Sequence, residues 1–211
     1  MPDERQESTG PPPERVGLYC LTKLSPEQES SILNSLGSGD MSDPFLIPWT
    51  SDEDGNLDDL HRLYKSVQRE TEGGSWTFVF FVDRESLSED SIILAKPDAY
   101  RLVYSREGAH ELDAILKEHS SSLPSVDDEL ADIFIDDLLD RALTYGRIKK
   151  ENFETAWANL DIDNMDVGEL VEESGGTLQL IEDPDWDAKA FVRKAEEAYK
   201  KRELEEGQAE T

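Results

Sequence analysis

The chain has 211 residues and carries 21 Lys and Arg against 49 Asp and Glu, a formal net charge of −28 at pH 7. This acidity argues against nucleic acid and anionic membranes as direct partners, because surfaces that bind phosphate need an excess of Lys and Arg. Hydrophobic residues make up 36% of the chain and include four Trp, which is too much apolar material for a wholly disordered acidic chain.

The sequence carries no sign of secretion or membrane insertion. Its single cysteine, Cys20, cannot form an internal disulfide, and the first fifteen residues are charged and proline-rich where a signal peptide would be apolar. No apolar run approaches the roughly 18 residues needed to span a bilayer. We therefore expect an intracellular protein, cytoplasmic or nuclear, that contacts no membrane and holds no cofactor.

The distribution of apolar residues predicts one α+β domain over residues 16–204, with a small central β-sheet, several packed helices and a helix-rich C-terminal half. Residues 1–15 and 205–211 lack apolar anchors that could offset the entropy of ordering them. Both ends are therefore predicted to be disordered tails.

The first elements are a strand and a helix. Residues 16–24 alternate apolar and polar side chains over part of their length, which predicts a strand. Ser25, Pro26 and Gln28 then suit the N-cap, N1 and N3 positions of a helix that Gly37 should end.

The next stretch predicts a loop followed by a second helix. Residues 38–56 are rich in Gly, Pro, Asp and Ser, which predicts a loop. Its core anchors would be Phe45, Ile47 and Trp49. Asn56 should cap a helix over residues 57–70. The apolar face of that helix would carry Leu57, Leu60, Tyr64 and Val67.

Three apolar runs predict one sheet. Residues 76–83, WTFVFFVD, are apolar and aromatic enough for a central strand buried on both faces. Residues 91–96 and 100–105 flank a short turn and predict a hairpin.

The remainder predicts mainly helices. The periodicity indicates helices over residues 109–117, 126–145, 149–160 and 166–173, and a last strand over residues 177–181. Asp183 and Pro184 would then provide the N-cap and N1 of a long final helix.

Two blocks resemble a known family. They are FFVDRESL, residues 80–87, and NLDIDNMDVGELVEE, residues 159–173. Both are similar to segments of an uncharacterised family of small intracellular proteins, a domain of unknown function. The resemblance implies a shared α+β fold and supplies no mechanism.

The predicted helix over residues 126–145 carries a row of aspartates. Asp128, Asp132, Asp136 and Asp140 follow one another at i, i+4 spacing. Each like-charge pair at this spacing costs roughly 0.2–0.5 kcal/mol. A solvated face opposite a well-packed apolar stripe would tolerate that cost, and a basic partner, a divalent cation or the lysines of the final helix could offset it. These four aspartates are the candidate partner-binding residues.

Asp83 and Glu85 are the candidate metal or catalytic residues. Asp83 ends the predicted central strand, where open α/β sheets place ligands, and an Asp-x-Glu pair could hold Mg²⁺. No phosphate-binding loop accompanies the pair in the sequence. A salt bridge from Asp83 to Arg84 or Arg101, or a cap at Ser86, is the structural alternative.

Other motifs do not predict a site. Asp161, Asp163 and Glu172 imitate a calcium loop, but Met165 and Asp166 stand where such a loop needs an oxygen ligand and a sharp turn. Cys20 is predicted to be a buried strand residue with a raised pKa. His61, His110 and His119 show no metal-ligand spacing.

Two functional hypotheses follow. The first is a non-enzymatic interaction module that presents acidic helices to a basic protein. The second is a metal-dependent hydrolase or phosphotransferase that uses Asp83 and Glu85.

Overall fold

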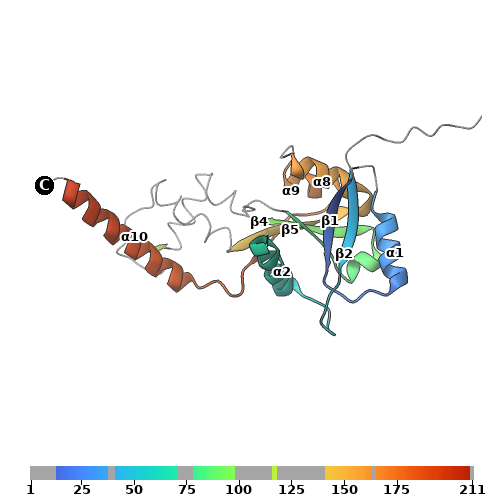
Figure 1. Cartoon of the computed structure of the whole chain (residues 1–211), viewed down its shortest axis with the longest axis horizontal. Coiled ribbons are helices and arrows are strands. Elements are labelled where there is room, and N and C mark those ends of the chain that lie inside the picture. The colour runs from blue at the N-terminus through green and yellow to red at the C-terminus, as the bar shows by residue number, and fades with distance from the viewer. Residues whose placement is uncertain are drawn as a thin grey trace, which may run out of the picture. The chain divides into compact units, whose positions relative to one another are not determined.

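A computed structural model describes residues 13–37, 41–70, 78–97, 116–117, 141–162 and 165–209 (Figure 1). The described strands form one mixed six-stranded sheet in the order β2-β1-β3-β4-β5-β6. Together with the helices between them, they confirm the predicted α+β class. None of the described helices is long and apolar enough to cross a membrane.

The chain groups into two compact units. The first comprises Met1–Gly55, Val79–Leu94 and Gly146–Leu178, and the second comprises Asn56–Phe78, Ala95–Tyr145 and Gln179–Thr211. The division falls within β4 (Ser91–Pro97) and β5 (Ala142–Lys149). The expectation of a single domain over residues 16–204 stays a prediction.

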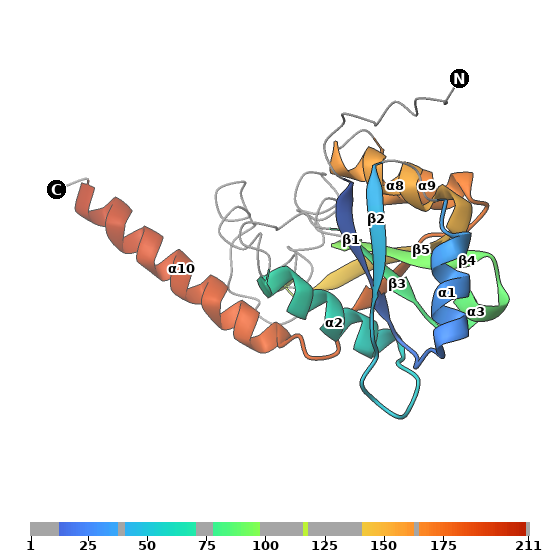
Figure 2. The ribbon, with the colours of Figure 1, turned by 45° about the vertical axis from the view of Figure 1, so that its right-hand side comes forward.

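The first unit contains three parallel strands. β1 (Glu14–Cys20) pairs in parallel with β2 (Ser42–Ile47) on one side and with β3 (Val79–Val82) on the other. The two pairings are visible as neighbouring ribbons in Figure 2. All four residues of β3 are buried, which confirms the predicted central strand.

Helices complete this unit. They are α1 (Pro26–Ser35), α3 (Glu85–Ser88), the 3₁₀ turn η1 (Lys150–Asn152), α8 (Phe153–Asp161) and α9 (Val167–Glu173). The ring of Phe80 on β3 packs on that of Phe153 on α8, with centroids 4.8 Å apart. This contact lies in the apolar core of the unit.

Two helices begin with a capping box, and the one at Ser25 confirms the predicted N-cap. The Ser25 side chain accepts a hydrogen bond from the Gln28 backbone, and the Gln28 side chain accepts one from the Ser25 backbone. Asp166 and Glu169 form the same reciprocal pair at the start of α9. These capping boxes hold N–H groups that would otherwise lack helical partners.

The predicted loop over residues 38–56 is wrong in part, because it contains β2. Pro44 lies in this strand, and Pro lacks the N–H that an interior strand would need. β2 is an edge strand with one neighbour in the sheet, and an edge position tolerates such a residue. Phe45 and Ile47 are therefore half-buried strand residues and not anchors of a loop.

The second unit contains α2 (Leu57–Glu70), β6 (Gln179–Glu182) and α10 (Ala188–Ala209). Asn56 caps α2 as predicted, since its side-chain oxygen accepts hydrogen bonds from the backbones of Asp58 and Asp59. α2 packs against β6 and buries Leu60 and Tyr64, but Leu57 is exposed. Leu57 therefore does not belong to the buried face.

Several predicted boundaries are corrected. β1 begins at Glu14 and α10 continues to Ala209, so neither predicted tail has the boundary expected. Ala142–Lys149 is strand β5, where a helix was predicted to reach Tyr145. α10 begins at Ala188, and the Asp187 carboxylate accepts hydrogen bonds from the backbones of Lys189 and Ala190. Asp183 is therefore not the N-cap of α10.

Candidate functional site

The carboxyl ends of β1 and β3 form the position where a ligand site is expected. β1 lies between β2 and β3, so the chain moves to one side of β1 and then to the other. In open α/β sheets, ligands bind at the carboxyl ends of strands where the strand order reverses in this way. Thr22 follows β1 here, and Asp83 and Arg84 follow β3.

Asp54 links the two strand ends. Its carboxylate accepts a hydrogen bond from the Thr22 hydroxyl on one side and from Arg84 Nη1, at 3.1 Å, on the other. The next residue, Gly55, donates its N–H to the carbonyl of Leu21 at 2.6 Å. The loop that contains Asp54 and Gly55 therefore connects the carboxyl ends of β1 and β3.

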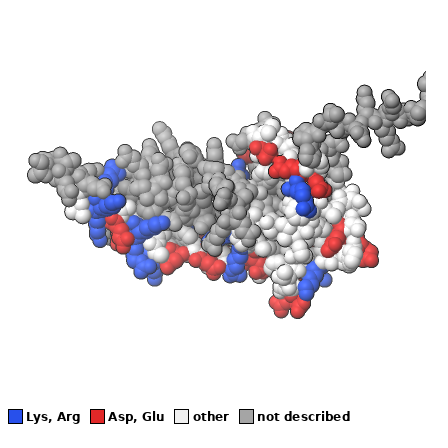
Figure 3. All heavy atoms as spheres, in the orientation of Figure 1, with Lys and Arg blue, Asp and Glu red and all other residues white. Residues whose placement is uncertain are grey.

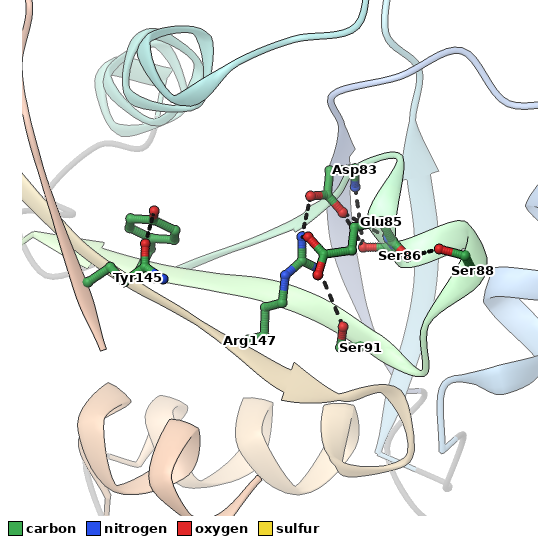
Figure 4. Close-up of polar contacts among 8 residues, drawn as sticks. Asp83, Glu85, Ser86, Ser88, Ser91, Tyr145 and Arg147 are labelled. Atoms are coloured by element: carbon green, nitrogen blue, oxygen red, sulfur yellow. Dashed lines mark hydrogen bonds and ion pairs between the residues drawn. The ribbon is translucent and has the colours of Figure 1, made fainter. Parts of the chain in front are cut away.

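Asp83, Glu85 and Arg147 form an ion cluster beside this point (Figure 4). Arg147, on β5, donates through the same Nη2 atom to Asp83 and to Glu85 Oε2, the latter at 2.8 Å. Its Nη1 also reaches Ser91 Oγ at 3.3 Å. The structure thus brings together the predicted Asp-x-Glu pair, but around an arginine.

The second oxygen of Asp83 caps the short helix α3. Asp83 Oδ1 accepts hydrogen bonds from Ser86 N at 2.9 Å and from Ser86 Oγ at 2.7 Å. Burial would by itself raise the pKa of Asp83, but the Ser86 hydroxyl and the Arg147 guanidinium hold that pKa below its ordinary value. Of the predicted structural alternatives, the cap at Ser86 is confirmed. Arg84 binds Asp54 instead of Asp83, and Arg101 lies outside the described residues.

This geometry disfavours a metal at Asp83 and Glu85. A divalent cation would have to displace the guanidinium from both carboxylates, and Asp83 would also have to give up its bonds to Ser86. Among the described residues, no group of three His, Cys, Asp or Glu is arranged to hold a metal ion. The chemistry that the cluster supports is a structural ion pair that ties β3 to β5.

A second ion cluster lies in the other unit. Lys65 Nζ on α2 contacts Asp183 Oδ2 at 2.6 Å, and His61 Nδ1 lies 3.8 Å from Asp183 Oδ1. Burial opposes ionisation of Asp183, but Lys65, the Asp185 backbone N–H and His61 hold its pKa below the ordinary value. The side chains of His61 and Asp183 are both 1% exposed, so a substrate cannot reach them, and the cluster joins α2 to the segment after β6.

The remaining predicted residues fall into two groups. Cys20 is buried in β1, and its pKa is raised to about 11 by burial and by Glu29, so it is a poor nucleophile at neutral pH. The other group lies outside the described residues and comprises Asp128, Asp132, Asp136, Asp140, Asp163, Arg101, His110 and His119.

Sequence reasoning missed Arg147, Asp54 and Lys65. The strand ALTYGRIK places Arg147 between buried neighbours, and a charged residue in such a strand calls for a carboxylate partner. That signal was hidden because residues 142–145 of the strand were predicted as the end of a helix, and Arg147 lay between that helix and the next predicted one.

Comparison of this chain with protein-family models, with curated proteins and with solved structures finds no match.

Proposed function

We propose that this protein is a non-enzymatic interaction module that binds a basic protein through the acidic segment 127–140. The observation that carries the proposal is the concentration of carboxylates in this segment, which contains no Lys, Arg or His. Its acidic residues are Asp127, Asp128, Glu129, Asp132, Asp136, Asp137 and Asp140.

The charges of the described surface support the choice of this segment. On the face in view in Figure 3, the described Asp and Glu lie in small groups that are interspersed with Lys and Arg. Among the described residues, several cations are paired with carboxylates, as Lys23 is with Asp52 and Arg84 with Asp54. A segment that has carboxylates and no cation of its own is a stronger attractor for a basic surface.

The alternative is a metal-dependent hydrolase or phosphotransferase at Asp83 and Glu85. No contact of the described residues favours it, because Arg147 binds both carboxylates. A metal site would reveal itself as a rise in melting temperature with Mg²⁺ or Mn²⁺, since a ligand that binds only the folded state stabilises it. We expect no such rise.

The test compares two variants with the same loss of charge. Asp132→Asn with Asp136→Asn removes two charges from the segment, and Glu172→Gln with Glu173→Gln removes two from exposed positions on α9. The probe is a fluorescent decalysine peptide. Each exposed ion pair contributes about 0.2–1 kcal/mol, so losing two should weaken binding roughly fivefold.

The expected result is weaker binding by the aspartate variant only, with the wild-type affinity falling steeply as salt rises. Equal weakening by both variants would show that the probe senses net charge alone and would contradict a role for this segment. Circular dichroism checks that both variants stay folded.

A further inference from the structure

The loop between β2 and α2, residues 48–55, presents a serine on an open turn. The chain leaves the end of β2 and runs out as a loop at the lower edge of the view in Figure 2. Thr50, Ser51, Asp52 and Glu53 are all exposed. A hydroxyl in such a position is within reach of another protein's active site.

The loop keeps its shape without the Ser51 hydroxyl. The Trp49 indole N–H donates to the Glu53 carbonyl at 2.6 Å, and Asp54 is held by Thr22 and Arg84. Ser51 Oγ accepts a hydrogen bond from Glu53 N at 3.3 Å, inside the loop itself. Other residues therefore set the conformation, and the serine can change without unfolding the unit.

Carboxylates follow the serine at each of the next three positions, in the sequence Ser51-Asp52-Glu53-Asp54. They are not equally available to a partner. The Asp52 side chain is 98% exposed although it pairs with Lys23. The Asp54 side chain is 43% exposed, and its carboxylate is bound by Thr22 and Arg84. Asp52 and Glu53 are the charges that an approaching protein would meet first.

We propose that Ser51 is a phosphorylation site for an acidophilic protein kinase, a kinase whose substrate groove is lined with Lys and Arg. The Ser51 oxygen attacks the γ-phosphorus of ATP, a new P–O bond forms, and the bond to the β-phosphate oxygen breaks. The hydroxyl proton passes to the kinase's base and ADP leaves. The products are phosphoserine and ADP, and no oxidant or reductant is involved.

The charges of the loop favour a kinase with a basic substrate groove over a kinase with an acidic one. A basic groove is complementary to Asp52 and Glu53, whereas a kinase with an acidic groove would be repelled by them. Phosphorylation then adds about −1.5 to −2 charge beside the loop's carboxylates. This assignment does not rest on the proposed binding of a basic partner, because the acidic segment 127–140 has no part in it.

The test incubates the full chain with Mg²⁺, ATP and a purified acidophilic kinase of the casein-kinase class, and it follows intact mass with site mapping by fragmentation. We expect fragmentation to place a phosphoryl group on Ser51, and we expect Ser51→Ala to gain one phosphoryl group fewer than the wild type. Ser88→Ala is the matched control, because Ser88 is also exposed and is followed by Glu89 and Asp90, but it lies in helix α3 and its hydroxyl donates to the Glu85 carbonyl at 3.2 Å. This control variant should be phosphorylated like the wild type.

A second variant tests the recognition itself. Asp52→Asn with Glu53→Gln keeps the serine and Asp54, and should slow phosphorylation about tenfold through lost attraction to the groove. Phosphate found on Thr50 or elsewhere, with Ser51→Ala labelled as well as wild type, would overturn the assignment. An equal rate with a kinase that prefers basic substrates would also overturn it, as would no incorporation at all.

Discussion

Arg147 is the residue on which the candidate site depends. Its side chain is 25% exposed and that of Asp83 is 22% exposed, so their ion pair is screened less by water than a surface pair. Removing the arginine would leave two carboxylates facing each other without a cation. Asp83 and Glu85 look like metal ligands in the sequence, but both carboxylates bind Arg147. They therefore connect the end of β3 and helix α3 to β5.

Arg147→Met should lower the free energy of unfolding by about 1.5–3 kcal/mol, the range for a hydrogen-bonded charged group. Urea unfolding at pH 7 measures it. Arg84→Met is the control, since Arg84 is 82% exposed and an exposed pair contributes at most about 1 kcal/mol. Equal losses in the two variants would contradict the special role of Arg147.

The cost of Arg147→Met should also depend on pH. The pKa of Asp83 is lower in the folded protein than its ordinary value. The ion pair therefore stabilises the fold fully at any pH above that ordinary pKa. This stabilisation is lost as pH falls through the folded-state pKa. The difference between wild type and variant should therefore shrink below about pH 4, and a difference that stays constant would show that packing and not charge is lost.

At the scale of elements, β5 and α9 meet at a glycine. A Cβ at the buried Gly146 would lie 2.5 Å from Val171 Cγ2, much closer than two carbons can approach. The next glycine on this interface, Gly176, would place a Cβ 2.7 Å from the carbonyl oxygen of Arg147. Glycine at these two positions lets the helix lie directly on the strand that carries Arg147.

Gly146→Ala should cost about 1–3 kcal/mol by overpacking. Val171→Ala removes the methyl groups that clash, so the double variant should be more stable than the sum of the two single changes predicts, by roughly 0.5–3 kcal/mol. Denaturant unfolding of all four proteins measures this coupling. Gly175→Ala is the control, because Gly175 has φ +76° and nothing within 4 Å, and strain of that kind is not relieved at Val171.

For the molecule as a whole, the net charge of −28 implies self-repulsion in the compact state. Salt shortens the Debye length from about 30 Å at 0.01 M to about 3 Å at 1 M. Raising NaCl across this range should therefore stabilise the fold, on the order of 1 kcal/mol if a few like-charge pairs are relieved. The urea midpoint measures the effect, and a midpoint that falls with salt would mean that ion pairs outweigh the repulsion.

Short-range features could be predicted from the sequence. The capping box at Ser25 was visible because its partner, Gln28, lies three residues away. The central strand β3 was visible because burial on both faces produces a continuous apolar run. Net charge needs no structure at all. The fold class followed from these local signals.

Only the tertiary structure decided the rest, because its contacts join residues that are distant in the chain. β2 is a strand because β1 offers it a parallel partner and its other edge can accept Pro44. Asp83 meets Arg147 across 64 positions of sequence and Lys65 meets Asp183 across 118. A carboxylate can bind any cation that the fold brings within reach, and sequence spacing does not say which one.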